Sequence, residues 1–126
     1  ILGDLAAVGA FLDGVFACPH HPQGNPPYAH PDHPGRKPNP GMLLAASGLL
    51  ALDLSASWIV GDKASDLQAG KNAGLAGGMH VLSGHGADVG ERAQAMALGG
   101  NRFRALAAPS IAGAESVLEP LNPNRP

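Results

Sequence analysis

Short apolar runs alternate along the chain with segments rich in glycine, proline and polar residues. Between Met42 and Leu50 a set of apolar residues marks one face at helical spacing, which predicts a helix; the set is Met42, Leu43, Ala46, Leu49 and Leu50. We expect Asn39 to cap this helix, Pro40 to occupy its first position, and Gly74 to end the next helix. The shorter runs predict strands, and alternating strands and helices indicate an α/β fold with a parallel sheet. The predicted helices are Ile1–Ala10, Met42–Leu50, Asp66–Ala73, Asp88–Leu98 and Ala112–Leu121, and the predicted strands are Gly14–Ala17, Ser57–Val60, Gly78–Leu82 and the edge strand Phe103–Leu106.

The composition limits the class of protein. A chain of 126 residues with 44% hydrophobic residues corresponds to one domain, and we expect residues 1–121 to belong to it and residues 122–126 to form a frayed tail. The net charge of −2 argues against a nucleic-acid partner. No apolar run reaches the roughly 20 residues that span a bilayer, which argues against a membrane protein. The single cysteine excludes an internal disulfide framework and is typical of a cytoplasmic protein.

A glycine and two acids follow the strand predicted at Ser57–Val60. Gly61 allows a tight turn that exposes Asp62 at the carboxyl end of the strand, where open α/β sheets bind their ligands. If the following residues are helical, Asp62 and Asp66 lie four residues apart on one face. Carboxylates suit Mg2+, and Lys63 beside them suits a phosphate, so the segment predicts a metal and phosphate site. Alternatively, the two acids only complement the dipole of a helix N-terminus.

Two adjacent cations, Arg36 and Lys37, precede the predicted start of the helix at Pro40. A planar guanidinium and a compact ammonium can together hold a phosphate. Taken alone, the pair would indicate a solvated basic turn. Because it lies a short way before Asp62 and Asp66, we predict that it contributes to the same site.

Three motifs, in this order, resemble those of a known family. They are Cys18-Pro-His-His-Pro-Gln-Gly24, Arg36-Lys-Pro-Asn-Pro-Gly-Met42 and Val60-Gly-Asp-Lys-Ala-Ser-Asp66. The set is similar to that of the D-glycero-D-manno-heptose-1,7-bisphosphate 7-phosphatase branch of the haloacid dehalogenase superfamily, and the histidinol-phosphate phosphatases share much of it. The resemblance runs from about Gly9 to about Gly86. It implies a partial Rossmann-like fold, with a parallel sheet and helices on both faces.

The resemblance also implies roles for individual residues. Lys37 would bind phosphate, Asp62 would ligate Mg2+, and Asp66 would support that ligand. Arg36 and Lys63 would contact the substrate, a small sugar phosphate. The implied activity is a Mg2+-dependent phosphatase that removes the 7-phosphate of D-glycero-D-manno-heptose 1,7-bisphosphate in the cytoplasm, with the intact protein acting as a monomer.

The nucleophile that the resemblance implies is missing from this sequence. The family attacks phosphorus with an aspartate and uses a second aspartate two residues later as general acid and base, but the chain contains no Asp-x-Asp. Phe11 stands where the nucleophile would be, so we interpret Asp13 as a turn residue. We therefore expect the chain to be the inactive C-terminal portion of a longer enzyme, or the product of a truncated reading frame. The Asp-x-Asp strand should then lie roughly 60–70 residues before Ile1.

The loop at positions 18–38 gathers prolines and four of the six histidines. Thiolate and imidazole suit tetrahedral Zn2+, and Cys18, His20 and His33 are candidate ligands. Metal-binding members of the resembling family close this loop with two cysteines, which here fall on His33 and Gly35. Gly35 has no side chain, and a fourth ligand would have to come from nearby: His30, Asp32 or water. A metal-free loop that contacts substrate is an equal alternative.

The two remaining histidines are given no role in the site. His80 lies within an apolar predicted strand, and we interpret it as a packed core or rim residue. His85 belongs to the turn Ser83–Gly86, which follows a strand end. In the resembling family the corresponding turn is structural or peripheral to the site, so His85 is not assigned.

Three functions remain open at this stage. The first is the Mg2+-dependent sugar-bisphosphate phosphatase, or its C-terminal part. The second is a non-catalytic remnant that binds metal or phosphate, which the absence of an upstream Asp-x-Asp coding sequence would favour. The third is a phosphatase of the same fold that acts on histidinol phosphate, and substrate profiling of an intact form separates it from the first.

Overall fold

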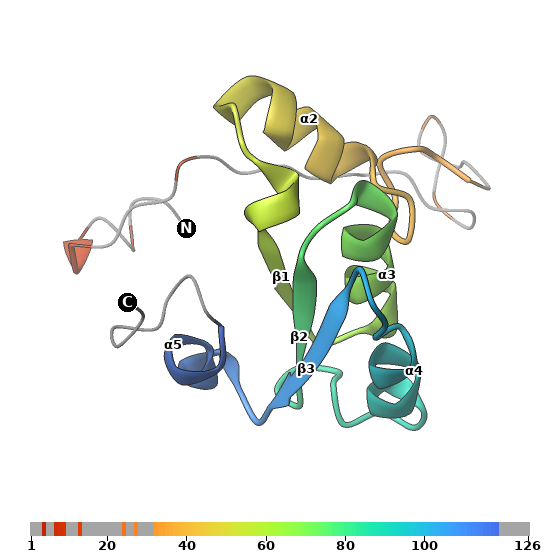
Figure 1. The fold of residues 1–126 in the computed structure, drawn as a ribbon, viewed down its shortest axis with the longest axis vertical. Coiled ribbons are helices and arrows are strands. Elements are labelled where there is room, and N and C mark those ends of the chain that lie inside the picture. The colour runs from red at the N-terminus through yellow and green to blue at the C-terminus, as the bar shows by residue number, and fades with distance from the viewer. Residues whose placement is uncertain are drawn as a thin grey trace.

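The structure, a computed structural model, describes residues 32–118 together with positions 4, 7–9, 13, 24 and 27. Helices and strands alternate along it (Figure 1), which confirms the predicted α/β fold. The helices are α2 (Gly41–Leu50), α3 (Ala64–Ala73), α4 (Glu91–Ala97) and α5 (Ala114–Val117), the strands are β1 (Trp58–Gly61), β2 (Gly77–Val81) and β3 (Arg104–Ala108), and short 3-10 helices lie at η1 (Leu54–Ala56) and η2 (Ile111–Gly113).

The three strands form one parallel sheet in the order β1-β2-β3. All five residues of β2 are buried, as expected for a central strand that is covered on both faces. The register pairs Gly61, the last residue of β1, with His80 of β2. β3 lies at an edge of the described sheet, as predicted for Phe103–Leu106, and continues to Ala108. Because the strands are parallel, their carboxyl ends lie at the same edge of the sheet. Asp62 follows β1 at this edge.

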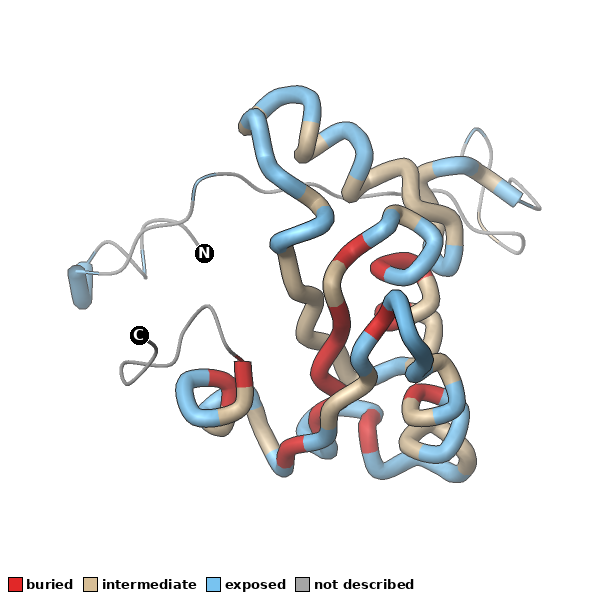
Figure 2. Tube along the Cα trace, viewed as in Figure 1, coloured by how far each residue is buried: buried red, intermediate tan, exposed pale blue. Residues whose placement is uncertain are grey.

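Helices pack on both faces of this sheet. α3 and α4 lie together on one face, and α5 lies on the other face beside β3 (Figure 1). Figure 2 shows that the buried residues concentrate in β2 and in the parts of α3 that approach it. Each face therefore has its own apolar core. The α3 and α4 face contains Leu67, Leu75, Ala95 and Phe103, and the α5 face contains Met79, Val81, Ala108, Ala114 and Leu118.

The bounds of α3 and α4 agree with the predicted bounds to within one residue at the C-terminal ends, but they differ at the N-terminal ends. The helix predicted at Asp66–Ala73 begins two residues earlier, and Gly74 ends it with φ 84°, as predicted. The helix predicted at Asp88–Leu98 begins only at Glu91. Gly90, immediately before it, has φ 85°, which is outside the right-handed helical region, so helical dihedrals cannot extend back through this position.

α2 agrees with the predicted Met42–Leu50 helix to within one residue, but its N-terminal end is built differently. Pro40, and not Asn39, is the N-cap residue, because the Pro40 carbonyl accepts the N–H of Leu44 at 2.9 Å. The Asn39 side chain instead donates to Oδ1 of Asp32 at 2.8 Å. Asn39 therefore stabilises the preceding loop, and the prediction of its capping role was wrong. The prediction that Pro40 occupies the first helical position was also wrong, because Gly41 occupies it.

The final helix is shorter than the predicted Ala112–Leu121. A 3-10 helix covers residues 111–113, and α5 ends where Leu118 adopts extended dihedrals of φ −88° and ψ 121°. The predictions for Gly14–Ala17 and for most of Ile1–Ala10 lie outside the described residues. Within the part of the chain that is described, no helix has the length and apolar character needed to cross a membrane.

Candidate functional site

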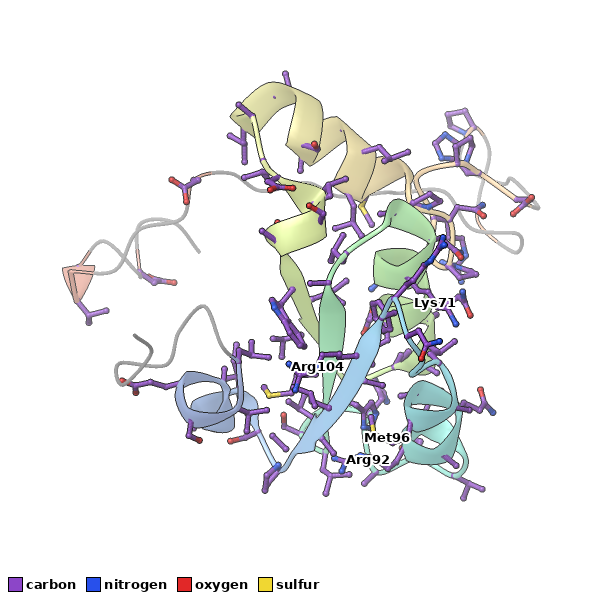
Figure 3. The ribbon with its side chains drawn as sticks, in the orientation of Figure 1. Lys71, Arg92, Met96 and Arg104 are labelled. Atoms are coloured by element: carbon purple, nitrogen blue, oxygen red, sulfur yellow. The ribbon has the colours of Figure 1, made fainter. Side chains whose placement is uncertain are left out.

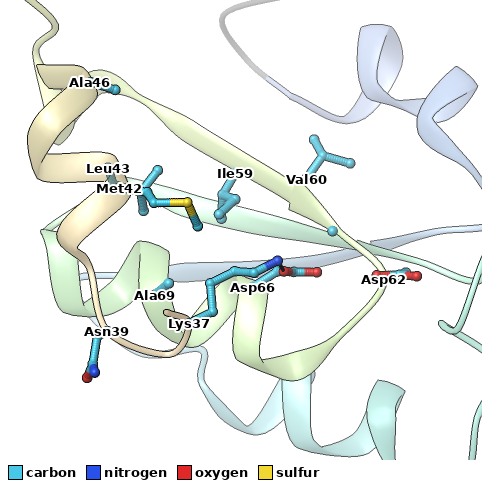
Figure 4. Close-up of a pocket in the computed structure, with 11 residues that line it drawn as sticks. Lys37, Asn39, Met42, Leu43, Ala46, Ile59, Val60, Asp62, Asp66 and Ala69 are labelled. Atoms are coloured by element: carbon cyan, nitrogen blue, oxygen red, sulfur yellow. Dashed lines mark hydrogen bonds and ion pairs between the residues drawn. The ribbon is translucent and has the colours of Figure 1, made fainter. Parts of the chain in front are cut away.

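Asp62 lies in the turn that joins β1 to α3, at the carboxyl end of the sheet (Figure 4). This is the position predicted from the strand and glycine pattern. However, Lys63 is the N-cap of α3 and the helix begins at Ala64, so Asp62 is not a helical residue. The expectation that Asp62 and Asp66 share one helical face was therefore wrong. The turn brings both acids to the wall of the same cavity instead.

Asp66 occupies the third position of α3 and is 7% exposed. Its Oδ2 accepts the backbone N–H of Lys63 at 3.1 Å, which satisfies one of the free donors at the helix N-terminus. Its Oδ1 forms an ion pair with the Lys37 ammonium. Both oxygens are thus engaged within the protein, so Asp66 serves the helix terminus and also holds Lys37.

Lys37 reaches Asp66 from the loop before α2, although the two residues are 29 positions apart in the sequence. The Lys37 side chain is 44% exposed, so its ammonium can contact a ligand while it pairs with Asp66. The loop is also tied to α3 through Asn72, whose side chain donates to the Pro38 carbonyl at 2.9 Å. The structure therefore joins the two motifs that the sequence singled out.

A cavity of about 430 Å³ lies between α2, β1 and α3. Lys37 extends towards Asp66, and Asp62 lies beyond Asp66 at the end of β1 (Figure 4). The rest of the wall is largely apolar, apart from Asn39. Its apolar side chains are Met42, Leu43, Ala46, Ile59, Val60 and Ala69. The cavity thus combines a compact group of charges with an apolar wall along β1.

The turn Ser83–Gly86 also contacts the site, which the sequence reasoning missed. The backbone N–H of His85 donates to Oδ2 of Asp62 at 2.8 Å. Gly84 has φ 63°, and a Cβ at this position would lie 2.5 Å from the same oxygen. The turn is therefore not peripheral, because its glycine permits a backbone donor to approach the Asp62 carboxylate.

The pKa of Asp62 lies below its ordinary value of 3.8, chiefly because its carboxylate accepts the His85 N–H, and partial burial opposes this effect. Asp62 is consequently an anion at neutral pH, which is the form that binds a divalent cation. A carboxylate offers about four lone-pair directions, and the His85 bond uses one of them. Asp62 therefore fits a Mg2+ ion, whereas Asp66 fits a supporting role.

Two further side chains hold the turn that carries Asp62. Glu91, at the start of α4, accepts the N–H of Ala64 through Oε2 at 2.6 Å and so caps α3 from a neighbouring helix. His80 is completely buried, which confirms its interpretation as a packed residue, and its Nε2 lies 2.8 Å from the Asp62 carbonyl oxygen. Neither contact was visible in the sequence, because each links residues that are brought close only by the fold.

Two of the predicted substrate contacts are not gathered at the cavity wall. Arg36 is half-buried and does not line the cavity, and its backbone N–H donates to the His33 carbonyl at 2.9 Å. Lys63 has an exposed side chain, and its contribution to the site is the backbone N–H that Asp66 accepts. The predicted substrate contacts of Arg36 and Lys63 stay predictions.

The predicted zinc site lies largely outside the described residues, since Cys18, His20 and His30 belong to that part of the chain. His33 is described, and its Nδ1 accepts the Gly35 N–H at 2.9 Å. Among positions 32–118 and the isolated residues before them, no group of three or more histidine, cysteine, aspartate or glutamate side chains is arranged to hold a metal. Zinc binding therefore stays a prediction.

Comparison with known proteins places these features in a family. Residues 35–100, more than half of the chain, match a family model described as HAD-hydrolase-like. A Mesorhizobium japonicum protein named D-glycero-beta-D-manno-heptose-1,7-bisphosphate 7-phosphatase is 59% identical over 81 residues, which are 64% of this chain and 37% of that protein. A Burkholderia mallei protein named D-glycero-alpha-D-manno-heptose-1,7-bisphosphate 7-phosphatase is 51% identical over 73 residues, or 58% of this chain and 39% of that protein.

A solved structure agrees with these relatives. The crystal structure of a protein described as a HAD-like phosphatase, from Mesorhizobium loti, matches with a TM-score of 0.62 and 57% identity, over 66% of this chain and 40% of that one. The chain thus spans less than half the length of the proteins it matches here. Because the family match contains Lys37, Asp62 and Asp66 and covers more than half of the residues, the chain belongs to the HAD-hydrolase-like family.

Proposed function

We propose that this chain is the C-terminal part of a Mg2+-dependent phosphatase that removes the 7-phosphate of D-glycero-D-manno-heptose 1,7-bisphosphate. The observation that carries the proposal is the pairing of Lys37 with Asp66 beside Asp62, at the carboxyl end of a parallel sheet. The names of the relatives in Mesorhizobium japonicum and Burkholderia mallei support the choice of substrate. The anomer stays open, because one name specifies the beta form and the other the alpha form.

Each described residue of the site would have its own role. Asp62 would hold Mg2+, which supplies positive charge to a transferring phosphoryl group. Lys37 would contact the phosphate with its exposed ammonium, while Asp66 fixes its position. Arg36 and Lys63, each adjacent in the sequence to a residue that lines the cavity, would contact the remainder of the sugar phosphate. His85 would keep the Asp62 carboxylate oriented and ionised.

The apolar wall of the cavity suits protein side chains better than a polar sugar. β1 is an edge strand within the described sheet, and edge strands of parallel sheets in this fold class are normally covered. We propose that a strand carrying the Asp-x-Asp motif pairs with β1, packs on Met42 and Ile59, and brings the nucleophilic aspartate towards Lys37 and Asp62. The domain that we assign to residues 1–121 would then be the C-terminal part of a larger phosphatase domain.

On this proposal the 126-residue chain has no phosphatase activity by itself. In-line attack on phosphorus requires a nucleophile, and the sequence contains no Asp-x-Asp. The 126-residue chain with Mg2+ should therefore release no phosphate above background from either anomer of the heptose bisphosphate or from histidinol phosphate. The form encoded together with the upstream Asp-x-Asp sequence should release the 7-phosphate. Measurable turnover by the chain alone, abolished by Asp62→Asn, would overturn this part of the proposal.

Substitutions in the longer form test the assigned roles. Asp62→Ala and Lys37→Ala should each remove most of the activity, because each deletes a charge placed at the phosphoryl group. Matched controls are Asp53→Ala, which lies at η1, and Lys71→Ala, whose ammonium donates to the Leu98 carbonyl on the surface. Near-normal turnover in either site variant would favour a purely structural role for the motifs. If the longer form instead prefers histidinol phosphate, the chain would belong to a histidinol-phosphate phosphatase.

We also propose that the complete protein acts as a cytoplasmic monomer on a small sugar phosphate, without a nucleic-acid or membrane partner.

We further propose that the loop at positions 18–38 binds Zn2+. Cys18, His20 and His33 would be ligands, and Gly35 leaves the fourth position to His30, Asp32 or water. Elemental analysis after dialysis against a mild chelator tests this ligand set. Zinc that remains bound in Cys18→Ser would exclude this ligand set. A dialysed protein without zinc would also exclude it.

A further inference from the structure

His80 is a completely buried polar residue in the centre of the sheet, and both of its ring nitrogens are engaged. Nε2 lies 2.8 Å from the carbonyl oxygen of Asp62, and Nδ1 lies 2.7 Å from Nε of Arg92. Arg92 belongs to α4 and lies beside the ends of the strands (Figure 3). A continuous line of hydrogen bonds thus runs from α4 through β2 to the turn after β1.

The chemistry of the partners fixes the direction of these bonds. A carbonyl oxygen can only accept, so Nε2 of His80 must carry the hydrogen that it donates to Asp62. The Nε–H of Arg92 can only donate, so Nδ1 of His80 must be the acceptor. One tautomer of the ring satisfies both contacts, and the Asp62 carbonyl and Arg92 together select it. A leucine or methionine in place of His80 would fill the same space but offer no donor.

Arg92 is itself fixed by the sheet. Its Nη2 donates to the Ala108 carbonyl at 3.0 Å and lies 3.4 Å from the His80 carbonyl. The guanidinium therefore spans the carboxyl ends of β2 and β3 while Nε faces the imidazole. Such a planar group with several fixed donors holds a partner in one orientation.

The Asp62 carbonyl needs this support because of its place in the chain. β1 ends at Gly61, so Asp62 lies beyond the last residue that the β1 and β2 register pairs. A backbone carbonyl in such a position must find another hydrogen-bond donor or lose a hydrogen bond. His80 supplies the donor at the main chain of Asp62, and the His85 N–H supplies one at its carboxylate.

We propose that Arg92 and His80 are positioning residues for Asp62. They hold its main chain so that the carboxylate meets the His85 N–H and faces the cavity. The metal-binding consequence rests on the proposed function, in which Asp62 holds Mg2+. The positioning itself can be read without any metal, because the His85 amide reports directly on the Asp62 carboxylate.

Nuclear magnetic resonance of the 15N-labelled 126-residue chain, without metal, gives the first test. In the unmodified chain, the His80 ring should show hydrogen on Nε2 only. His80→Leu should speed hydrogen exchange of the His85 amide roughly tenfold, the factor expected when a charge-assisted hydrogen bond is lost. His80→Gln retains a side-chain N–H and should restore most of the protection. Met79→Leu, at the neighbouring buried position facing the other core, is the matched control and should leave this amide unchanged.

Arg92→Met provides a second variant in case His80→Leu does not fold. It keeps the apolar stem but removes the donor to Nδ1, so the His80 ring loses one of the two contacts that fix its orientation and the His85 amide should exchange faster. An unchanged His85 amide in Arg92→Met, or in a folded His80→Leu, would overturn the proposal. Equal loss of protection in His80→Gln and His80→Leu would also overturn it, because a donor at this position would then have no special effect.

A Mg2+ titration followed on the same amides separates this inference from the proposed function. His80→Leu should weaken Mg2+ binding about tenfold at Asp62, and His80→Gln by no more than about threefold, in proportion to the hydrogen bond each one removes. If the unmodified chain binds no Mg2+ while the His85 amide still responds to His80, the positioning role holds and the assigned metal role fails. If Mg2+ binds equally in all variants, the positioning role fails.

Discussion

Helices α2 and α3 are both ten residues long, but they are stabilised in opposite ways. α2 has the sequence GMLLAASGLL, in which Ser47 is the one polar side chain, yet none of its residues is buried. Leu44 and Leu49 are 52% and 76% exposed. α3 has the more polar sequence ASDLQAGKNA, and it buries four of its residues against the sheet. Position relative to the sheet, and not apolar content, therefore decides which helix is buried.

The difference extends to the helix ends. At the N-terminus of α3, Asp66 and Glu91 accept the first two N–H groups of the turn, and Gly74 closes the other end. α2 has no side-chain cap at its N-terminus. We infer that β1, α3 and β2 form the stable unit that carries Asp62 and Asp66, and that α2 opens at a lower free energy. The apolar residues of α2 that line the cavity would be covered by the strand proposed to pair with β1.

Leucine truncations should give the largest difference in stability between the two helices. Leu67→Ala in α3 removes a completely buried side chain and should lower the free energy of unfolding by about 2–5 kcal/mol. Leu44→Ala in α2, a half-exposed position, should change it by no more than about 0.5 kcal/mol. Urea unfolding followed by circular dichroism measures both. Similar losses in the two variants would show that α2 is packed as tightly as α3.

Glycine substitutions should differ in sign between the two regions. Gly84→Ala forces a Cβ to within 2.5 Å of Oδ2 of Asp62 at φ 63°, and should destabilise the chain by about 1–3 kcal/mol. Gly48→Ala lies within α2, has open space around it, and should stabilise by about 0.5–1 kcal/mol through helix propensity. Thermal unfolding of the two variants decides the point. A neutral Gly84→Ala would mean that the turn does not need its close approach to Asp62.

Acid unfolding gives the smallest effect. Because the folded pKa of Asp62 lies below its ordinary value of 3.8, its carboxylate binds protons less readily in the folded chain than in the unfolded one. The stability that this difference contributes is complete above the unfolded pKa, and it is lost as the pH falls below about 4 through the lower folded value. Asp62→Asn should therefore flatten the pH dependence of stability in this acid range. Parallel profiles for the two proteins would exclude the effect.

The sequence predicted the parts of this architecture that depend on local patterns. Apolar spacing located α2, α3 and all three described strands to within about two residues, and the glycine after α3 identified its end. The family motifs implied that Lys37 and Asp66 belong to one site, and the structure brings the two side chains together in an ion pair. These features need only periodicity, turn chemistry or a motif that survives intact in the chain.

Features that depend on contacts across the fold were not predicted. The late start of α4 results from the left-handed backbone at Gly90, which nothing in the helical pattern reveals. The His85 N–H reaches Asp62 because two parallel strands end side by side, and the bond uses a main-chain atom that carries no sequence signature. Glycine at position 84 was the available signal, since a loop glycine after a strand end often permits a close backbone approach.

The central claim is that Lys37, Asp62 and Asp66 form one site for a divalent cation and a phosphate. A Mg2+ titration of the 15N-labelled chain in the presence of inorganic phosphate tests it most directly. We expect saturable shifts at the amides of Asp62, Lys63 and His85 and at the Lys37 ammonium, with the response abolished by Asp62→Ala and unchanged by Asp53→Ala. Saturable shifts elsewhere in the chain, or none at these four residues, would contradict the account.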